Sequence, residues 1–149
     1  MSIGNEKLSE KLAVVAKLDP KSQSAATVTS DYVDMAKIKK VIFILQTGAL
    51  GTSATVDMAI KGDTASGGSY ATTITGKSIT QLVKASNDNN IAIVEVSAAE
   101  VAAQGYRYIR ASVTVGTAAS LISLVALGGN LTYSNASEND LAAVVEIVA

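Results

Sequence analysis

The stretch from Gly105 to Tyr133 constrains the fold more than any other part of the chain. In its first half, YRYIRASVTV, every second residue is apolar (Ile109, Ala111, Val113 and Val115), and the residues between them are polar or aromatic. A period of two is the pattern of a half-buried strand. After a few small residues, LISLVAL is almost continuously apolar, as in the strands of a sheet interior, and Gly128-Gly129-Asn130 ends it. The sequence therefore predicts two long strands joined by a tight connection.

Other segments carry strand patterns as well. Residues 22–33 are rich in Ser and Thr and predict an edge strand with Val28 and Tyr32 inward, and VIFIL at 41–45 predicts a central strand. ATVDMAIK alternates with Ala54, Val56, Met58 and Ile60 on its inner side, IAIVEVS predicts another strand, and LAAVVEIVA at the end of the sequence predicts a terminal one. Between these, residues 70–85 fit short strands or a helical turn, and AAEVAAQG predicts a short helix.

These segments add up to seven or eight strands separated by turn signals, with no long helices between them. This order argues against a parallel α/β sheet. We expect an antiparallel β-sandwich of jelly-roll-like topology, with a short N-terminal helix or arm.

The N-terminal segment differs from the rest. Its apolar residues Leu8, Leu12, Val15 and Leu18 recur at helical spacing, Asn5 is placed as an N-cap, and Asp19-Pro20 ends the pattern. We therefore divide the chain into an N-terminal helical segment or arm, residues 1–21, and a β-sandwich domain, residues 22–149. A helix this short is marginal alone in water, so it either packs on its own domain or orders on a partner.

Composition excludes several functional classes. The 149 residues include no His and no Cys, so a Ser-His-Asp triad, a His general base and thiolate metal ligands have no candidates. The formal net charge of −1 gives no basic field for nucleic acid, and no apolar run approaches the ~18 residues that span a bilayer. No secretion signal is apparent, and Asn87–Asn90 reads as a turn more than as a calcium site. We expect a protein that is not an enzyme, needs no cofactor and binds neither nucleic acid nor membrane.

Tyr106, Tyr108 and Arg110 lie on the less apolar face of the predicted strand at 106–115. Tyrosine and arginine are enriched at protein interfaces, although these side chains could also cover a second layer of the same domain. Low charge, 17% of residues, and many small side chains also suggest faces that meet other protein. Our hypothesis for the partner interface comprises Leu8, Leu12, Val15, Leu18, Tyr106, Tyr108 and Arg110.

Three segments together resemble small virion structural proteins of tailed phages, which are typically encoded near the major capsid protein. They are VIFILQTGALGTSATVDMAIKGDTASGGSY, the I-x-G-K-x-I-T segment from Ile74 to Thr80, and residues 91–133, so the resemblance covers about residues 40–133. The N-terminal segment and the ending LAAVVEIVA depart from that pattern.

The resemblance implies a non-enzymatic protein that decorates or completes the phage head. It implies a homo-oligomer that binds the major capsid protein or other virion proteins, and that resides in the virion after synthesis in the host cytoplasm. Two alternatives stay open. One is a tail-tube or tail-completion subunit, and the other is a carbohydrate-binding β-sandwich module that stacks sugars on exposed tyrosines.

Overall fold

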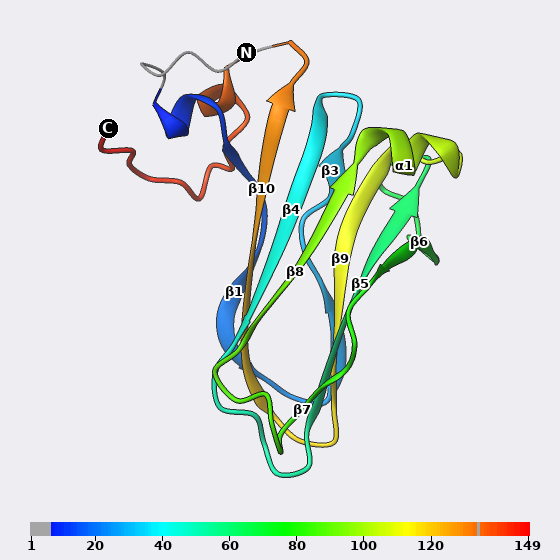
Figure 1. The fold of residues 1–149 in the computed structure, drawn as a ribbon, viewed down its shortest axis with the longest axis vertical. Coiled ribbons are helices and arrows are strands. Elements are labelled where there is room, and N and C mark those ends of the chain that lie inside the picture. Colours follow the sequence, from blue (N-terminus) through cyan, green and yellow to red (C-terminus); the bar gives the residue numbers. More distant parts are fainter. Residues whose placement is uncertain (1–6, 134) are drawn as a thin grey trace.

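The computed structural model describes residues 7–133 and 135–149, and these form two antiparallel sheets packed face to face (Figure 1). The first sheet has the order β1-β10-β4-β8, with β1 at Ala13–Gln23, β10 at Ser120–Leu131, β4 at Ile38–Thr47 and β8 at Ile91–Ser97. The second has the order β2-β9-β5-β6, with β2 at Ala26–Thr29, β9 at Tyr108–Gly116, β5 at Thr55–Asp63 and β6 at Thr72–Ser78. Two short strands join the second sheet, β3 (Val33–Asp34) on β9 and β7 (Leu82–Val83) on β5.

The pairing follows one rule. β1 pairs with β10, β2 with β9, β4 with β8, and β5 with β6, so the first half of the chain pairs with the second half like one long hairpin. This double ribbon is wrapped so that alternate pairs fall into the two sheets. Such wrapping is jelly-roll topology. The predicted antiparallel, jelly-roll-like sandwich is confirmed.

Alternation along the strands builds the core. The predicted inward residues of β5 and β9 are buried, and β4 contributes Val41, Phe43 and Leu45 from the first sheet. Phe43 is fully buried and lies opposite Ala126 of β10, whose small side chain leaves room for the ring. VIFIL is a central strand, as predicted, because β4 lies between β10 and β8.

The predicted N-terminal helix is wrong over the residues that the structure describes. Leu8–Glu10 form one 3-10 turn, and Val15 and Leu18 belong to β1. A break in register between Val14 and Ala16 turns both Val15 and Ala16 into the core, which gives an apolar spacing that resembles a helix. Asn5, the predicted N-cap, lies outside the described residues. β1 also runs through the boundary drawn between residues 21 and 22.

Three other local predictions meet the structure with mixed results. The short helix at 98–105 is confirmed as α1 (Ala98–Ala103), which Ser97 and Glu100 cap reciprocally. β2 is an edge strand with Val28 partly buried, but Tyr32 is 50% exposed and not inward. Residues 141–149, predicted as a terminal strand, contain no strand in the single chain.

We expect Phe43→Ala to lower the free energy of unfolding by about 3–5 kcal/mol, because it leaves a ring-sized cavity at the centre of the core. Ile44→Ala is the matched control, since Ile44 follows on the same strand but faces outward, and should cost about 1 kcal/mol. Urea denaturation followed by circular dichroism measures both. Equal losses would contradict this assignment of inner and outer positions.

Candidate interaction surface

The outer face of the four-stranded sheet is apolar although nothing in the described chain packs over its centre. Ile44 of β4 lies between Val125 of β10 and Ile93 of β8, and Ile42 lies beside Leu127. We call this surface the apolar face and define it as the outward residues Ile42, Ile44, Ile91, Ile93, Leu121, Val125 and Leu127. Ile91 is 58% exposed, Ile93 56%, Leu121 47% and Val125 41%. Gln46 and Ser123 also face outward and separate Leu121 from the other residues of this face. The other residues form a contiguous exposed apolar patch, and such patches mark contact sites in proteins.

The outer face of the second sheet is different. There β9 turns Tyr108, Arg110, Ser112 and Thr114 outward, and β5 turns out Thr55, Asp57, Ala59 and Lys61. This is the ordinary polar exterior of an antiparallel sheet. The two exteriors of one sandwich therefore differ in kind, and only the first has the composition of an interface core.

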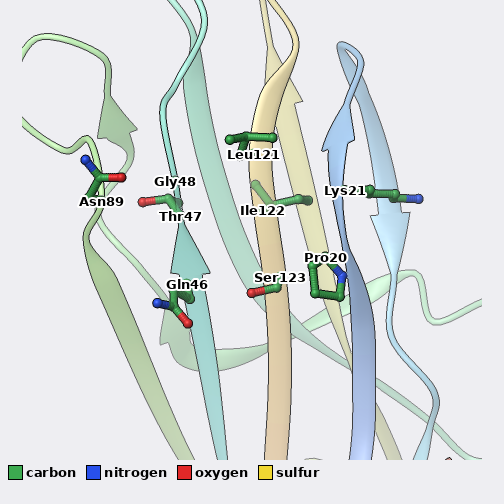
Figure 2. Close-up of a pocket in the computed structure, with 9 residues that line it drawn as sticks. All are labelled: Pro20, Lys21, Gln46, Thr47, Gly48, Asn89, Leu121, Ile122 and Ser123. Carbon is green, nitrogen blue, oxygen red and sulfur yellow. The ribbon is translucent and has the colours of Figure 1, made fainter.

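A hollow of about 410 Å³ lies at one end of the four-stranded sheet (Figure 2). Its lining residues come from β1, β4 and the residue after it, the loop before β8, and β10: Pro20, Lys21, Gln46, Thr47, Gly48, Asn89, Leu121, Ile122 and Ser123. Gly48 permits the close approach of β10, because a Cβ there would lie 2.9 Å from the Cβ of Leu121. Thr47 is buried and donates its hydroxyl hydrogen to the carbonyl of Asn90 at 3.0 Å. The lining offers amides, hydroxyls, the Lys21 side chain and apolar surface, with no carboxylate among its residues.

A second hollow, of about 260 Å³, lies at the other end of the same sheet. It is lined mainly by apolar side chains with one residue of each charge: Leu12, Lys40, Val41, Ile42, Glu95, Leu127, Gly129 and Asn130. Both hollows share residues with the apolar face, Leu121 in the first and Ile42 and Leu127 in the second. The face and its two hollows thus adjoin one another on the same sheet.

The tyrosines and arginines form a cluster that is held mainly by contacts within the chain. Tyr108 meets Tyr32 edge to face with ring centres 5.6 Å apart, and the Arg107 guanidinium lies 5.0 Å from the centre of the Tyr108 ring. The guanidinium carbon of Arg110 lies 4.2 Å from the centre of the Tyr70 ring. The buried Nε of Arg110 has no hydrogen-bond partner among the described residues. Burial raises the pKa of the Tyr70 hydroxyl, which donates to the carbonyl of Ser66 at 3.0 Å.

A two-pronged ion pair anchors this cluster. Arg107 donates from Nε and from Nη2 to the two carboxylate oxygens of Asp34, both at 2.8 Å. These hydrogen bonds hold the pKa of Asp34 below its ordinary value, and they raise the pKa of Arg107. The pair ties β3 to the residue before β9, so its role on this geometry is structural.

The residues predicted as a partner interface do not come together. Leu8 is 69% exposed, Leu12 lines the smaller hollow, Val15 is buried in the core, and Leu18 packs partly against it. Tyr106 packs against the core, close to the buried Gly62, where an added Cβ atom would lie 3.0 Å from the tyrosine ring. Tyr108 and Arg110 lie on the outer side of β9. The described structure thus favours the alternative in which much of this set packs on its own domain. An interface role for the exposed members stays a prediction.

Sequence reasoning missed the apolar face, although the signal was present. VIFIL and LISLVAL are apolar at consecutive positions, which is typical of strands covered on both sides. In the single chain only one side is covered.

Groups of side chains that suit a metal ion do not occur among the described residues, and no helix there is long and apolar enough to cross a membrane. The Asn87–Asn90 segment is a turn whose side chains already accept hydrogen bonds. Asp88 accepts from the backbone of Leu50 at 2.9 Å, and Asn87 from that of Val83 at 2.9 Å.

A scan against models of protein families finds no match, and neither does a comparison with curated proteins. Comparison with solved structures finds a chain of the disulfide-linked pili of Bacillus endospore appendages, with 13% identity, a TM-score of 0.41, and coverage of 88% of this chain and 100% of that one. It also finds a chain of infectious bursal disease virus, Gt strain, with 13% identity, a TM-score of 0.41, and coverage of 91% of this chain and 38% of that one. A chain of the full particle of Israeli acute paralysis virus has 9% identity, a TM-score of 0.41, and coverage of 90% of this chain and 76% of that one. These neighbours belong to pili and to virus particles. With TM-scores below 0.5, the likeness is too loose to assign a function to this chain.

We expect Asp34→Asn to lower the free energy of unfolding by about 1 kcal/mol at pH 7, because it removes an ion pair with bidentate geometry and a half-exposed arginine. The pKa of Asp34 is depressed in the folded state, so its contribution is present above the unfolded value near 4 and is lost as pH falls through the folded one. Thermal unfolding at pH 7 and pH 3 should show a gap between wild type and variant that closes in acid. A gap independent of pH would contradict the assignment.

Proposed function

We propose that this chain is a non-enzymatic structural subunit of a tailed-phage virion that decorates or completes the head. The observation that carries the proposal is the apolar face, whose central residue Ile44 is flanked by apolar neighbours on both adjacent strands. Such a surface is costly to leave in water and suits a subunit that is covered by other protein. The jelly-roll topology agrees by analogy, since it recurs in viral capsid domains as well as in lectins. The resemblance of residues 40–133 to phage virion proteins supplies the particular kind of particle.

The partner on this proposal is the major capsid protein or another virion protein, together with further copies of this chain. The apolar face offers the core of such a contact, and Lys40 and Glu95 beside the smaller hollow offer polar contacts at its rim. On this proposal the N-terminal segment contributes to attachment only through residues that precede β1, where Leu8 is exposed. Residues 13–20 pair with β10, so deletion of residues 1–20 would damage the sheet itself.

The carbohydrate-binding alternative finds less support at Tyr106 and Tyr108. Sugar stacking needs an open ring face, but Arg107 lies over Tyr108 and Tyr106 packs toward Gly62. Immunogold labelling of purified particles separates the remaining alternatives, since we expect label on the head. Label confined to the tail selects the tail subunit, and absence of the protein from particles overturns the proposal.

Val125→Lys tests whether the apolar face does the binding. Val125 is 41% exposed at the centre of the sheet, so the lysine can remain in water and the melting temperature should fall by only a few degrees. We expect incorporation into particles, measured by quantitative mass spectrometry, to drop at least about tenfold. Thr114→Lys, on the outer side of the second sheet, is the matched control and should be incorporated normally. Normal incorporation of Val125→Lys would contradict a role for this face.

A further inference from the structure

The last nine residues, LAAVVEIVA, have the composition of a strand but pair with no strand in the part of the chain that the structure describes. Apolar residues dominate both alternating sets, and Val and Ile are strong strand formers. In the single chain Val145 is 97% exposed, Val148 89% and Ile147 46%. We call residues 141–149 the C-terminal segment.

The C-terminal segment starts beside β1 and then leaves it. Asp140 accepts a hydrogen bond from the backbone N–H of Val14 at 2.6 Å, and Leu141 donates its own N–H to the carbonyl of Val14 at 2.8 Å. A turn follows, in which Val144 donates to the carbonyl of Leu141 at 2.9 Å. Figure 1 shows the segment running away from the sheet on the β1 side.

The edge of β1 is built against further pairing. Its register is broken between Val14 and Ala16 and again between Leu18 and Lys21, and Pro20 has no N–H to donate. The Asp31 carboxylate already accepts the N–H of Lys17 at 3.2 Å. Bulges, proline and charge are the means by which sheets block their edges. The C-terminal segment therefore cannot continue along the strand where it starts.

β8, the other edge of this sheet, lacks these means over the run Ile91–Val94. Among the described strands only β4 pairs with it within the sheet, and the run Ile91–Val94 has no charge and no proline. Lys77 of the second sheet donates to the carbonyl of Glu95 at 2.8 Å, so this part of the edge is already occupied. The contact also shows that the odd-numbered residues of β8 aim their backbone groups away from β4. Ile91 and Ile93 thus combine an outward backbone with side chains more than half exposed.

The two edges of the second sheet are poorer templates. β2 has four residues, and β6 contains Gly76 at φ +76° and pairs with β5 in irregular register. β8 is consequently the best template for an added strand among the described strands.

We propose that the C-terminal segment of one copy pairs as an added strand with β8 of a second copy. Pairing supplies backbone partners to both strands, and it places Val145 and Ile147 beside Ile91 and Ile93 on the outer side of the sheet. It also extends the apolar face, which strand addition at the edge leaves open to a further partner. The inference concerns self-association alone and does not depend on a virion.

Exchange between copies fits the dimensions better than pairing within one chain. Nine extended residues reach about 30 Å, and the crossing from β1 over β10 and β4 to β8 takes about 14 Å of that. Residues 141–149 would use about half of this reach to cross their own sheet before any of them met β8. A second copy can present the run Ile91–Val94 without that crossing.

Cysteine cross-linking tests the contact on the full-length chain, which has no cysteine of its own. Ile93→Cys protein is mixed, under mild oxidation, with tagged Val145→Cys or Ile147→Cys protein. We expect a mixed disulfide dimer in at least one mixture, at a yield at least about tenfold above that of Ile93→Cys with Thr114→Cys. Mixed dimers at neither position overturn the proposal, as does a predominance of Ile93→Cys homodimers, which would indicate face-to-face packing of two sheets.

Association of purified protein gives an independent measurement. Sedimentation velocity should show wild type self-associating, with association at least about tenfold weaker in Val145→Pro and in Ile93→Lys. Both residues are exposed in the single chain, so melting temperatures should be unchanged apart from the loss of association. Thr72→Lys, on the edge strand β6, is the matched control and should associate like wild type. A wild type that stays monomeric, or variants that associate normally, would overturn the pairing.

Discussion

The antiparallel pairing of β4 with β10 is the interaction on which the rest of the structure depends. It aligns Phe43 with Ala126 and Leu45 with Leu124 on the inner side, and these residues fill the space that the second sheet covers. The same register aligns Ile44 with Val125 on the outer side. Because successive side chains of a strand point to opposite faces, a strand that is apolar at every position gives its sheet two apolar faces. A sandwich of two sheets covers only one of them.

Much of the fold could be predicted because its central strands keep a regular period. β5 and β9 pair in continuous register, so the alternation of Val56, Met58 and Ile60 in the sequence is the alternation of burial in the structure. At the N-terminus that relation fails, because the bulge in β1 places Val15 and Ala16 on the same side. A bulge exists only relative to a partner strand more than a hundred residues away, so the local spacing favoured a helix instead.

The candidate surface was harder to predict, and for two distinct reasons. The predicted interface residues around Tyr106 assumed that the strand began there, but β9 begins at Tyr108. The backbone N–H of Tyr106 instead donates to the carbonyl of Val101 at the end of the short helix, and the Tyr106 side chain turns inward. The apolar face was not predicted, for the opposite reason. Its residues were recognised as parts of strands in a sheet interior. The number of layers that cover a strand depends on topology, however, and local sequence does not specify topology.

Composition links the remaining features. With aromatic residues at 4%, the core is built mostly from Val, Ile, Leu and Ala, which bury less surface per residue than rings do. Part of the apolar content is placed instead on the apolar face and at the C-terminus, where it adds little to the stability of one chain. A partner that covers these surfaces binds only the folded state and therefore stabilises it in proportion to the logarithm of its concentration. The fold of this chain is thus expected to gain stability from assembly. The edge of β1 is blocked and the run Ile91–Val94 of β8 at the opposite edge is open, so assembly by strand addition would have a direction.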